Sequence, residues 1–348
     1  MSGNVGAESV NESSRLTNCN FCKAALMIII VLYHSGIFSN GIHNAVGPND
    51  MLGTFLKWLA TFHNYAFVLI SGYIYCYIKT EREGYKSFRG FISKKAKRLL
   101  IPFFIVGYLW VFPIRAKFLD YTAQQIIYNF VLGINPGQLW FLFMLFWVFV
   151  YSHIIYRYFS NNMFYTALIV LAVFYAGMIL GNHIPNVFQV FTGTYYLPYF
   201  FAGFCMRKYE VKICRIENLM LAMAIVCNLA IFFLSYSISH QGLFGTLMTL
   251  IGLPVMRLSG AIMAFLILDR LAHIIPWNNK FGRFLCTASF PIYLFHEQII
   301  YFFAPYLGES FGPIISMISV FIIAMVITSI LSGILMKRPF TKAILGLS

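Results

Sequence analysis

The stretch FCKAALMIIIVLYHSGIFSNG, residues 21–41, is an apolar run that is long enough to cross a bilayer as a helix. About 20 apolar helical residues span the ~30 Å hydrocarbon core. Further runs of this kind follow along the whole chain. They cover residues 54–78, 98–114, 138–156, 163–181, 194–206, 218–238, 246–268, 283–306 and 313–336. The sequence therefore predicts an all-α polytopic membrane protein with about ten transmembrane helices.

The composition supports this fold class. Of 348 residues, 60% are hydrophobic and 10% are charged, whereas a soluble domain has about 45–50% apolar and 25% charged residues. A water-soluble globule is excluded, and so is intrinsic disorder, which requires low hydrophobicity and high charge. The apolar runs leave no room for a large soluble domain. We expect a cytoplasmic N-terminal tail at residues 1–20, one membrane domain at 21–336 and a cytoplasmic C-terminal tail at 337–348.

The distribution of basic residues predicts the orientation. The net charge is +14, and basic residues gather in the cytoplasmic loops of membrane proteins. With the N-terminus inside, all Lys and Arg residues fall on the cytoplasmic side except Lys57, Arg115, Lys117 and Arg257. Both termini are then cytoplasmic, as an even number of spans requires. This topology accounts for the positive charge. We therefore expect no nucleic-acid partner, and we expect membrane lipids as partners.

The cysteines give no strong sign of a metal or redox site. Cys19 and Cys22 form one C-x-x-C at the start of the first run. A zinc site of this type requires a second pair of ligands. Most of the other cysteines lie inside apolar runs, where Cys acts as a small hydrophobic residue. We therefore expect no metal.

Ionisable side chains inside the runs indicate the functional centre, because such residues are costly in a membrane and usually face the bundle interior. His34, His63, Arg257 and His296 all fall roughly 10–16 Å below the outer edge of the bilayer, and Glu297 follows His296. Any one buried histidine is more often a hydrogen-bonded core residue. The shared depth favours a common site. Arg257 requires a carbonyl, a substrate anion or a carboxylate, and a buried pair with Glu297 is the structural alternative.

The spacing between Lys23 and His34 is also informative. Eleven residues at about 100° each return to nearly the same helix face, with the two side chains ~16 Å apart along the axis. A cation at the inner mouth and an imidazole deep on the same stripe suit a long donor with an anionic head. The simpler alternative is that Lys23 only anchors the helix at the cytoplasmic surface.

Several segments together resemble one known family. Lys23 and His34 match its R/K-x10-H signature. The other matching segments, in order, are FVLISGYIY (67–75), KKAKRLLIPFF (94–104), QLWFLFML (138–145), YLPYFFAGF (196–204) and SFPIYLFH (289–296). In this order they resemble the acyltransferase family 3 membrane O-acyltransferases, and the resemblance covers essentially the whole chain.

The resemblance implies an integral protein of the bacterial inner membrane that moves an acetyl or other acyl group from cytosolic acetyl-CoA to a hydroxyl. The acceptor would be a cell-surface polysaccharide or its lipid-linked precursor. His34 would be the essential imidazole of the family. Lys23 stands at its Arg/Lys position, and Lys95 and Arg98 stand at its inner basic positions.

These considerations define a set of expected site residues. His34, His63, Arg257 and His296 are expected in catalysis, Lys23, Lys95 and Arg98 in binding of the donor, and Tyr73, Trp140 and Glu297 in binding of the acceptor substrate. His34 would act as a general base or carry the acyl group covalently, and Arg257 or His296 would stabilise the oxyanion. For the Ser71–Gly72–Tyr73 segment and for Trp140, helix packing is the alternative.

Two other functions remain open from the sequence alone. In the first, the protein exports a surface polysaccharide. In the second, it is an assembly partner of the polysaccharide synthesis machinery. An exporter requires a ladder of polar residues along several spans. Here the polar residues lie at one depth, which favours acyl transfer.

Overall fold

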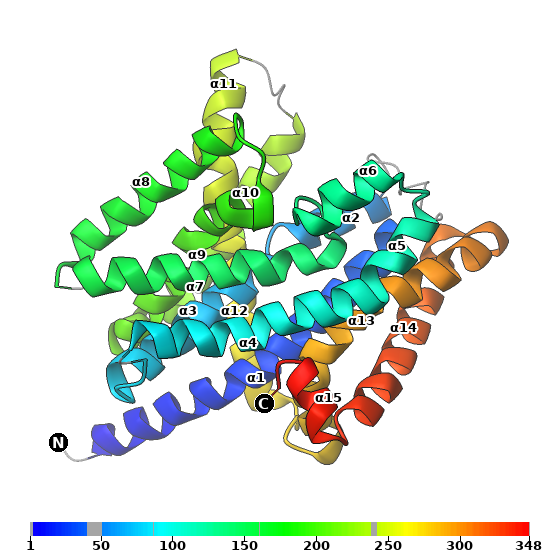
Figure 1. Ribbon diagram of the computed structural model, residues 1–348. Helices are drawn as coiled ribbons and strands as arrows, with labels where there is room; N and C mark the ends of the chain where they lie inside the picture. Colours follow the sequence, from blue (N-terminus) through cyan, green and yellow to red (C-terminus); the bar gives the residue numbers. More distant parts are fainter. Residues whose placement is uncertain (1–2, 40–50, 86, 160, 238–241, 348) are drawn as a thin grey trace.

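A computed structural model describes residues 3–39, 51–85, 87–159, 161–237 and 242–347, and every regular element within these ranges is helical. The ends of four predicted segments, at residues 1–2, 40–41, 238 and 348, lie outside the described residues. The first predicted run lies in helix α1, Gly3–Ile37, which starts well before residue 21. The predicted N-terminal tail and the first span therefore share one continuous helix (Figure 1).

The other predicted runs also fall in helices. The α-helices that follow α1 are α2 (Met51–Ala60), α3 (His63–Cys76), α4 (Phe88–Val106), α5 (Phe112–Phe118), α6 (Ala123–Ile126), α7 (Trp140–Phe159), α8 (Met163–Gly181), α9 (Val190–Lys208), α10 (Glu210–Ser237), α11 (Gly242–Leu247), α12 (Leu253–Ile274), α13 (Lys280–Ser310), α14 (Pro313–Leu335) and α15 (Pro339–Ile344). Wide π-type turns occur at η1 (Tyr77–Glu81), η2 (Gly107–Val111), η3 (Ile127–Val131) and η6 (Met248–Gly252), and 3₁₀ turns at η4 (Gly137–Leu139) and η5 (Val187–Gln189).

Seven helical segments in the described part of the chain are long and apolar enough to cross a membrane. They are Arg15–Ile37, Phe88–Phe118, Gly137–Phe159, Met163–Gly181, Glu210–Ser235, Gly242–Ile274 and Pro313–Leu335. The protein is thus an all-helical integral membrane protein. The three remaining predicted runs correspond to α2 with α3, to α9 and to α13. The count of ten spans and the cytoplasmic orientation of the termini stay predictions.

One predicted run is not a single helix. The run at 54–78 is broken where α2 ends at Ala60 and α3 begins at His63. Nδ1 of His63 donates to the backbone oxygen of Leu59 at 2.7 Å across this break. The side chain therefore satisfies a carbonyl at the end of α2, where the last turn of a helix has free acceptors.

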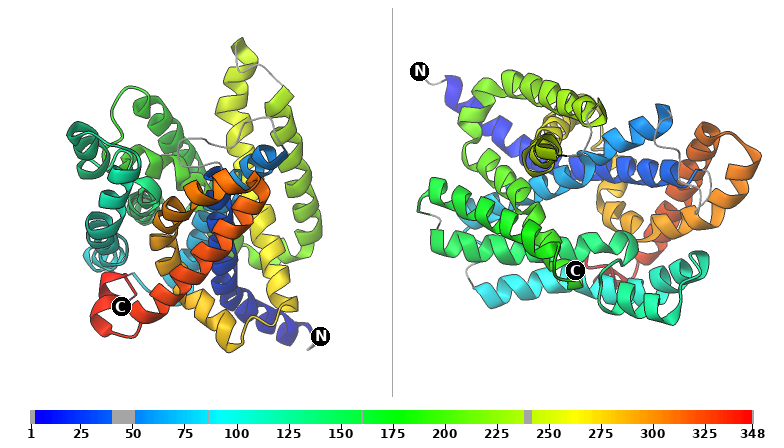
Figure 2. Two further views of the ribbon diagram at one scale, coloured as in Figure 1. Left: turned by 90° about the vertical axis from the view of Figure 1, so that its right-hand side faces the viewer. Right: turned by 90° about the horizontal axis from the view of Figure 1, so that it is seen from above.

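Helix α1 contacts α3, α12, α13 and α14, and so runs through the interior of the bundle. In Figure 1 α8 and α9 lie to one side of it, and α13 and α14 lie to the other. Figure 2, seen from above, gives the same arrangement. Both termini lie in the lower part of Figure 1 and of the left view in Figure 2. Arg15 and Asn18 of α1 are accordingly buried against other helices.

The contact between α3 and α9 depends on two glycines. A Cβ atom at Gly72 would lie 1.9 Å from the backbone oxygen of Phe200, and one at Gly203 would lie 1.8 Å from that of Leu69. Small residues let helix backbones approach in membranes. The close packing predicted for the Ser71–Gly72–Tyr73 segment is therefore present.

We predict that Gly72→Ala destabilises the protein, because the new methyl group would overlap a backbone oxygen that has no room to move. Overpacking of this kind costs about 2 kcal/mol. The free energy of unfolding is measured by denaturant titration in mixed micelles. Gly333→Ala is the matched control, since its Cβ atom would meet the Phe284 ring at 3.6 Å, an ordinary contact. Equal stabilities of the two variants would contradict the proposed packing role of Gly72.

Candidate active site

A cavity of about 170 Å³ lies between α1, α3, α4, α7 and α13. Three cationic residues line it, namely Lys23, Lys95 and Arg98. Ile30 of α1 and Tyr293 of α13 also line it. The cavity therefore extends along α1 for at least seven residues, which is about 10 Å of helix. The cavity thus brings together the three predicted donor-binding residues, which come from α1 and α4.

None of these three cations has a carboxylate partner in the part of the chain that the structure describes. Lys95 instead has its Nζ atom 3.7 Å from the centroid of the Phe149 ring and 5.3 Å from that of Tyr85. Lys95 and Arg98 share a face because residues i and i+3 are neighbours on a helix. The helix starts where the hydroxyl of Ser87 accepts from the backbone N–H of Gly90 at 3.0 Å. The arrangement leaves positive charge available to an anion.

His34 lies one helical turn beyond Ile30 on α1. Its ring meets the ring of His296 edge-on, with the centroids 5.0 Å apart. Its Nδ1 atom lies 3.5 Å from Oε2 of Glu297, in a geometry that makes no hydrogen bond. Because a carboxylate only accepts, this approach favours the proton on Nδ1 of His34. The lone pair is then on Nε2, where a base requires it.

The carboxylate of Glu297 is held by two further side chains. Nη1 of Arg115 donates to Oε1 at 2.6 Å, and the hydroxyl of Tyr301 donates to the same oxygen. Arg115 also donates to the Tyr301 hydroxyl at 2.6 Å. Glu297 and Tyr301 lie at i and i+4 on α13 and therefore on one helix face. Glu297 thus contacts protein groups through both oxygens and orients His34.

His296 has a different environment. Its Nδ1 atom donates to the backbone oxygen of Tyr293 at 2.8 Å, so in the neutral ring Nε2 carries the lone pair. Nε2 of His296 and Nδ1 of His34 are buried without a hydrogen-bond partner among the described residues. Buried polar atoms are normally satisfied. Two such atoms on adjacent rings indicate a place for a polar group that the protein does not supply.

His63 and Trp140 border this region. The ring of His63 lies 5.0 Å from that of Tyr33, the residue before His34. Trp140 lies 5.8 Å from Phe141, which lines the cavity. His63 is thus near the centre, with Nδ1 engaged in the helix contact at Leu59.

Arg257 does not pair with Glu297, so this predicted alternative is wrong. Glu297 forms its ion pair with Arg115, which lies on α5 beside α13. Arg257 lies between two rings, with its Cζ atom 5.4 Å from the centroid of Tyr65 and 5.3 Å from that of Tyr195. Sequence spacing alone does not reveal which of two arginines reaches a carboxylate on another helix.

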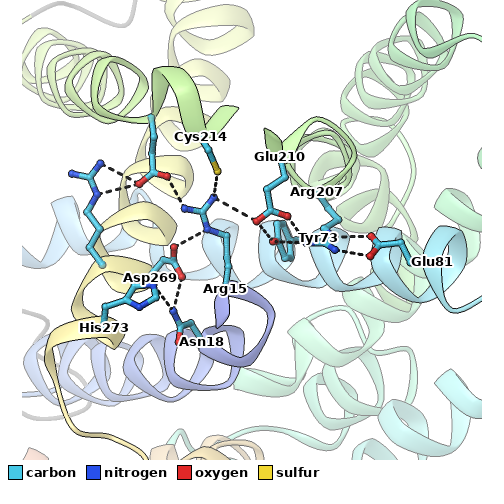
Figure 3. Close-up of polar contacts among 11 residues, drawn as sticks. Arg15, Asn18, Tyr73, Glu81, Arg207, Glu210, Cys214, Asp269 and His273 are labelled. Carbon is cyan, nitrogen blue, oxygen red and sulfur yellow. Dashed lines mark hydrogen bonds and ion pairs between the residues drawn. The ribbon is translucent and has the colours of Figure 1, made fainter. Parts of the chain in front are cut away.

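Tyr73 is not brought to the cavity. Its hydroxyl donates to Oε1 of Glu210 at 2.7 Å, and the side chain is fully buried. Arg207 contacts the same carboxylate and pairs with both oxygens of Glu81 at 2.7 and 2.6 Å. Figure 3 shows this group as part of a larger polar network. Tyr73 therefore ties α3 to α9 and α10, away from His34.

The second half of the network is centred on Arg15 of α1 (Figure 3). Its guanidinium donates to Oδ2 of Asp269 at 2.7 Å and to Oε2 of Glu217 at 2.6 Å. Asn18, one turn further on, donates to Oδ1 of Asp269 at 2.9 Å and lies 3.1 Å from Nε2 of His273. These contacts fix α1 against α10 and α12. They also fix the direction in which Lys23 and His34 point.

Sequence reasoning missed Arg115, Tyr301 and the Arg15 network. Arg115 falls one residue beyond the predicted run 98–114, so the apolar pattern places it outside the span, on the non-cytoplasmic side. The i, i+4 spacing of Glu297 and Tyr301 was an available signal. Arg15 and Asp269 fall near predicted span ends, where a charged residue is expected to be solvated.

The arrangement of a buried imidazole, an orienting carboxylate and a cavity lined by cations defines a membrane-embedded enzyme. A family model described as an acyltransferase domain matches residues 17–337. The chain therefore belongs to acyltransferase family 3, as its sequence motifs predicted. No curated protein and no solved structure matches it.

We predict that Arg15→Gln lowers the free energy of unfolding by about 3 kcal/mol, because it leaves buried carboxylates without their cation. Arg270→Gln is the control. Arg270 pairs with the same Glu217, but its side chain is 40% exposed, so its loss costs less than about 1 kcal/mol. Denaturant titration in micelles compares the two variants, and an equal loss in both would argue against the buried network.

Proposed function

We propose that the protein is an O-acyltransferase that moves an acetyl group from cytosolic acetyl-CoA to a hydroxyl of a cell-surface polysaccharide or its lipid-linked precursor. The observation that supports this proposal is the cavity lined by Lys23, Lys95 and Arg98, three cations without a carboxylate partner among the described residues, whose lining on α1 reaches Ile30, one turn before His34. Membership of the acyltransferase family supports the reaction class. The family resemblance of the sequence supports the bacterial inner membrane as its location.

The donor would bind along the cavity. Lys23, Lys95 and Arg98 would hold the phosphates of the nucleotide, since cations without carboxylate partners are free to bind anions. The apolar wall that includes Phe141 suits the aliphatic arm of the donor. The thioester would then lie toward His34, which follows Lys23 by eleven residues, ~16 Å along α1.

The chemistry would be general-base catalysis. Nε2 of His34 takes the proton of the acceptor hydroxyl while the hydroxyl oxygen attacks the thioester carbonyl carbon. The carbon–sulfur bond then breaks, and the proton passes to the departing thiolate. Glu297 would stabilise the imidazolium that forms between these steps. Arg115 has a buried Nε–H without a partner among the described residues, a donor suited to the oxyanion of the intermediate.

We predict that His34→Ala and Glu297→Gln both reduce acetyl transfer, the first by at least a hundredfold, because a positioned base contributes about 10²–10⁴-fold. Purified protein is assayed with radiolabelled acetyl-CoA and a surface-glycan acceptor, with folding checked by size-exclusion chromatography. His183→Ala is the control, since His183 is an exposed residue at the end of α8. Normal transfer by folded His34→Ala protein would reject this mechanism.

We predict that Lys23→Gln and Lys95→Gln raise the KM for acetyl-CoA about tenfold each and leave kcat within a fewfold, because they remove charge from donor binding alone. Lys337→Gln serves as the comparison, because Lys337 is exposed and does not line the cavity. The steady-state kinetics of the three variants provide the measurement. An unchanged KM in both cavity variants would show that the donor phosphates bind elsewhere.

A further inference from the structure

We propose that Arg257 and the aromatic residues around it form the acceptor subsite, and that this subsite selects a glycan carrying an acid group. The acid would be the carboxylate of an acidic sugar or the phosphate of a lipid-linked precursor, since both present anionic oxygens to a guanidinium. This inference rests on the proposed acyl transfer and names the class of its acceptor.

The charge of Arg257 has no carboxylate partner among the described residues. A guanidinium does not lose its proton in a protein, and a charge inside a membrane helix requires a partner. Arg15, Arg115 and Arg207 each have a carboxylate oxygen at 2.7 Å or less. Arg257 has none within ion-pair distance in the described ranges, and contacts the rings of Tyr65 and Tyr195 instead. The protein therefore leaves the anionic partner of this arginine to a ligand.

The position of Arg257 along α12 also supports this subsite. It precedes Asp269 by twelve residues on α12 and so lies ~18 Å along the helix from the Arg15 network. His34 follows Arg15 by 19 residues on α1, ~28 Å along that helix. Tyr65 is two residues after His63, whose ring lies 5.0 Å from that of Tyr33. Arg257 is thus linked to the His34 centre through α3, which carries both Tyr65 and His63.

A packed cluster of aromatic side chains joins Arg257 to the donor cavity. Tyr65 stacks on Tyr196, with ring centroids 4.7 Å apart and planes 6° from parallel. Trp140 lies 5.7 Å from Tyr196 and 5.8 Å from Phe141, a cavity residue. The hydroxyl of Tyr199 is buried without a partner among the described residues. Tyr65, Tyr196 and Tyr199 are buried, whereas Trp140 is partly exposed, and a partly exposed indole face suits the apolar face of a sugar.

The charges of the two subsites explain why the donor would bind at one of them and the acceptor at the other. Lys23, Lys95 and Arg98 offer several cations to a donor with several phosphates. Arg257 offers one cation between two tyrosine rings, which suits a single acid group on a sugar. Because Arg257 would hold the acid group and His34 would act on the hydroxyl, the acid group and the reacting hydroxyl would be different groups of one acceptor.

The test is a binding measurement with the full-length protein in lipid nanodiscs. Three tetrasaccharides of equal length are titrated by calorimetry: oligogalacturonate, neutral oligogalactose, and oligogalactose bearing a 1-phosphate. We expect one or both acidic probes to bind wild-type protein about tenfold more tightly than the neutral probe, the strength of one charge-assisted hydrogen bond. Arg257→Gln should reduce this ratio to less than twofold, and Arg257→Lys should keep most of it.

The outcomes separate the sources of the anion. Preference for the carboxylate probe assigns an acidic sugar, and preference for the phosphate probe assigns the lipid-linked precursor. Equal affinity for all three probes, absence of binding by all of them, or an unchanged ratio in Arg257→Gln overturns the proposal. If Arg257→Gln does not fold, loss of the ratio in folded Arg257→Lys overturns it as well.

Acetyl transfer to the same probes is measured separately, so that the two proposals fail in different ways. Selective binding through Arg257 without any transfer from acetyl-CoA would reject the acyltransferase reaction and leave the subsite standing. Transfer that depends on His34 but proceeds equally to acidic and neutral probes, in wild type and in Arg257→Gln, would reject the subsite alone.

Discussion

The cost of an unpaired charge in a bilayer governs this structure. Charged side chains in helices that cross a membrane are tolerated where they meet a partner or a polar cavity. Arg15 and Arg115 meet carboxylates inside the bundle, and these pairs join helices that are distant in sequence. Lys23 and Arg257 meet none in the described part of the chain. The same constraint therefore separates charges that hold the fold from charges that are open to ligands.

Helix α1 connects the two kinds of charge. It is fixed at one end through Arg15, it presents Lys23 to the cavity and it carries His34 further along. A rotation of this helix would move all three side chains together, because they lie on one rigid element. The contacts of Arg15 with Asp269 and Glu217 thus bear on the position of His34, although they lie about 28 Å from it along the axis.

Much of the fold was predictable from the sequence, because hydropathy is a local property. Within the residues that the structure describes, each apolar run lies mainly in helical structure, although the run at 54–78 is interrupted between Ala60 and His63. The juxtaposition of His34 and His296 followed from depth along the helices. Pairing was less predictable. Arg115 rather than Arg257 pairs with Glu297, because this pairing depends on how α5 packs against α13. Tyr73 bonds to Glu210 in the Arg15 network, which likewise depends on the packing of helices that are distant in sequence.

The contacts that orient His34 come from parts of the chain that are made at very different times. Arg115 precedes Glu297 by 182 residues, and Arg15 precedes Asp269 by 254. The early helices are therefore made before the carboxylates of α12 and α13 exist, and the contact between His34 and Glu297 forms only once α13 has been made. A nascent or truncated chain without these late helices has His34 but lacks the carboxylate that lies beside it in the folded protein.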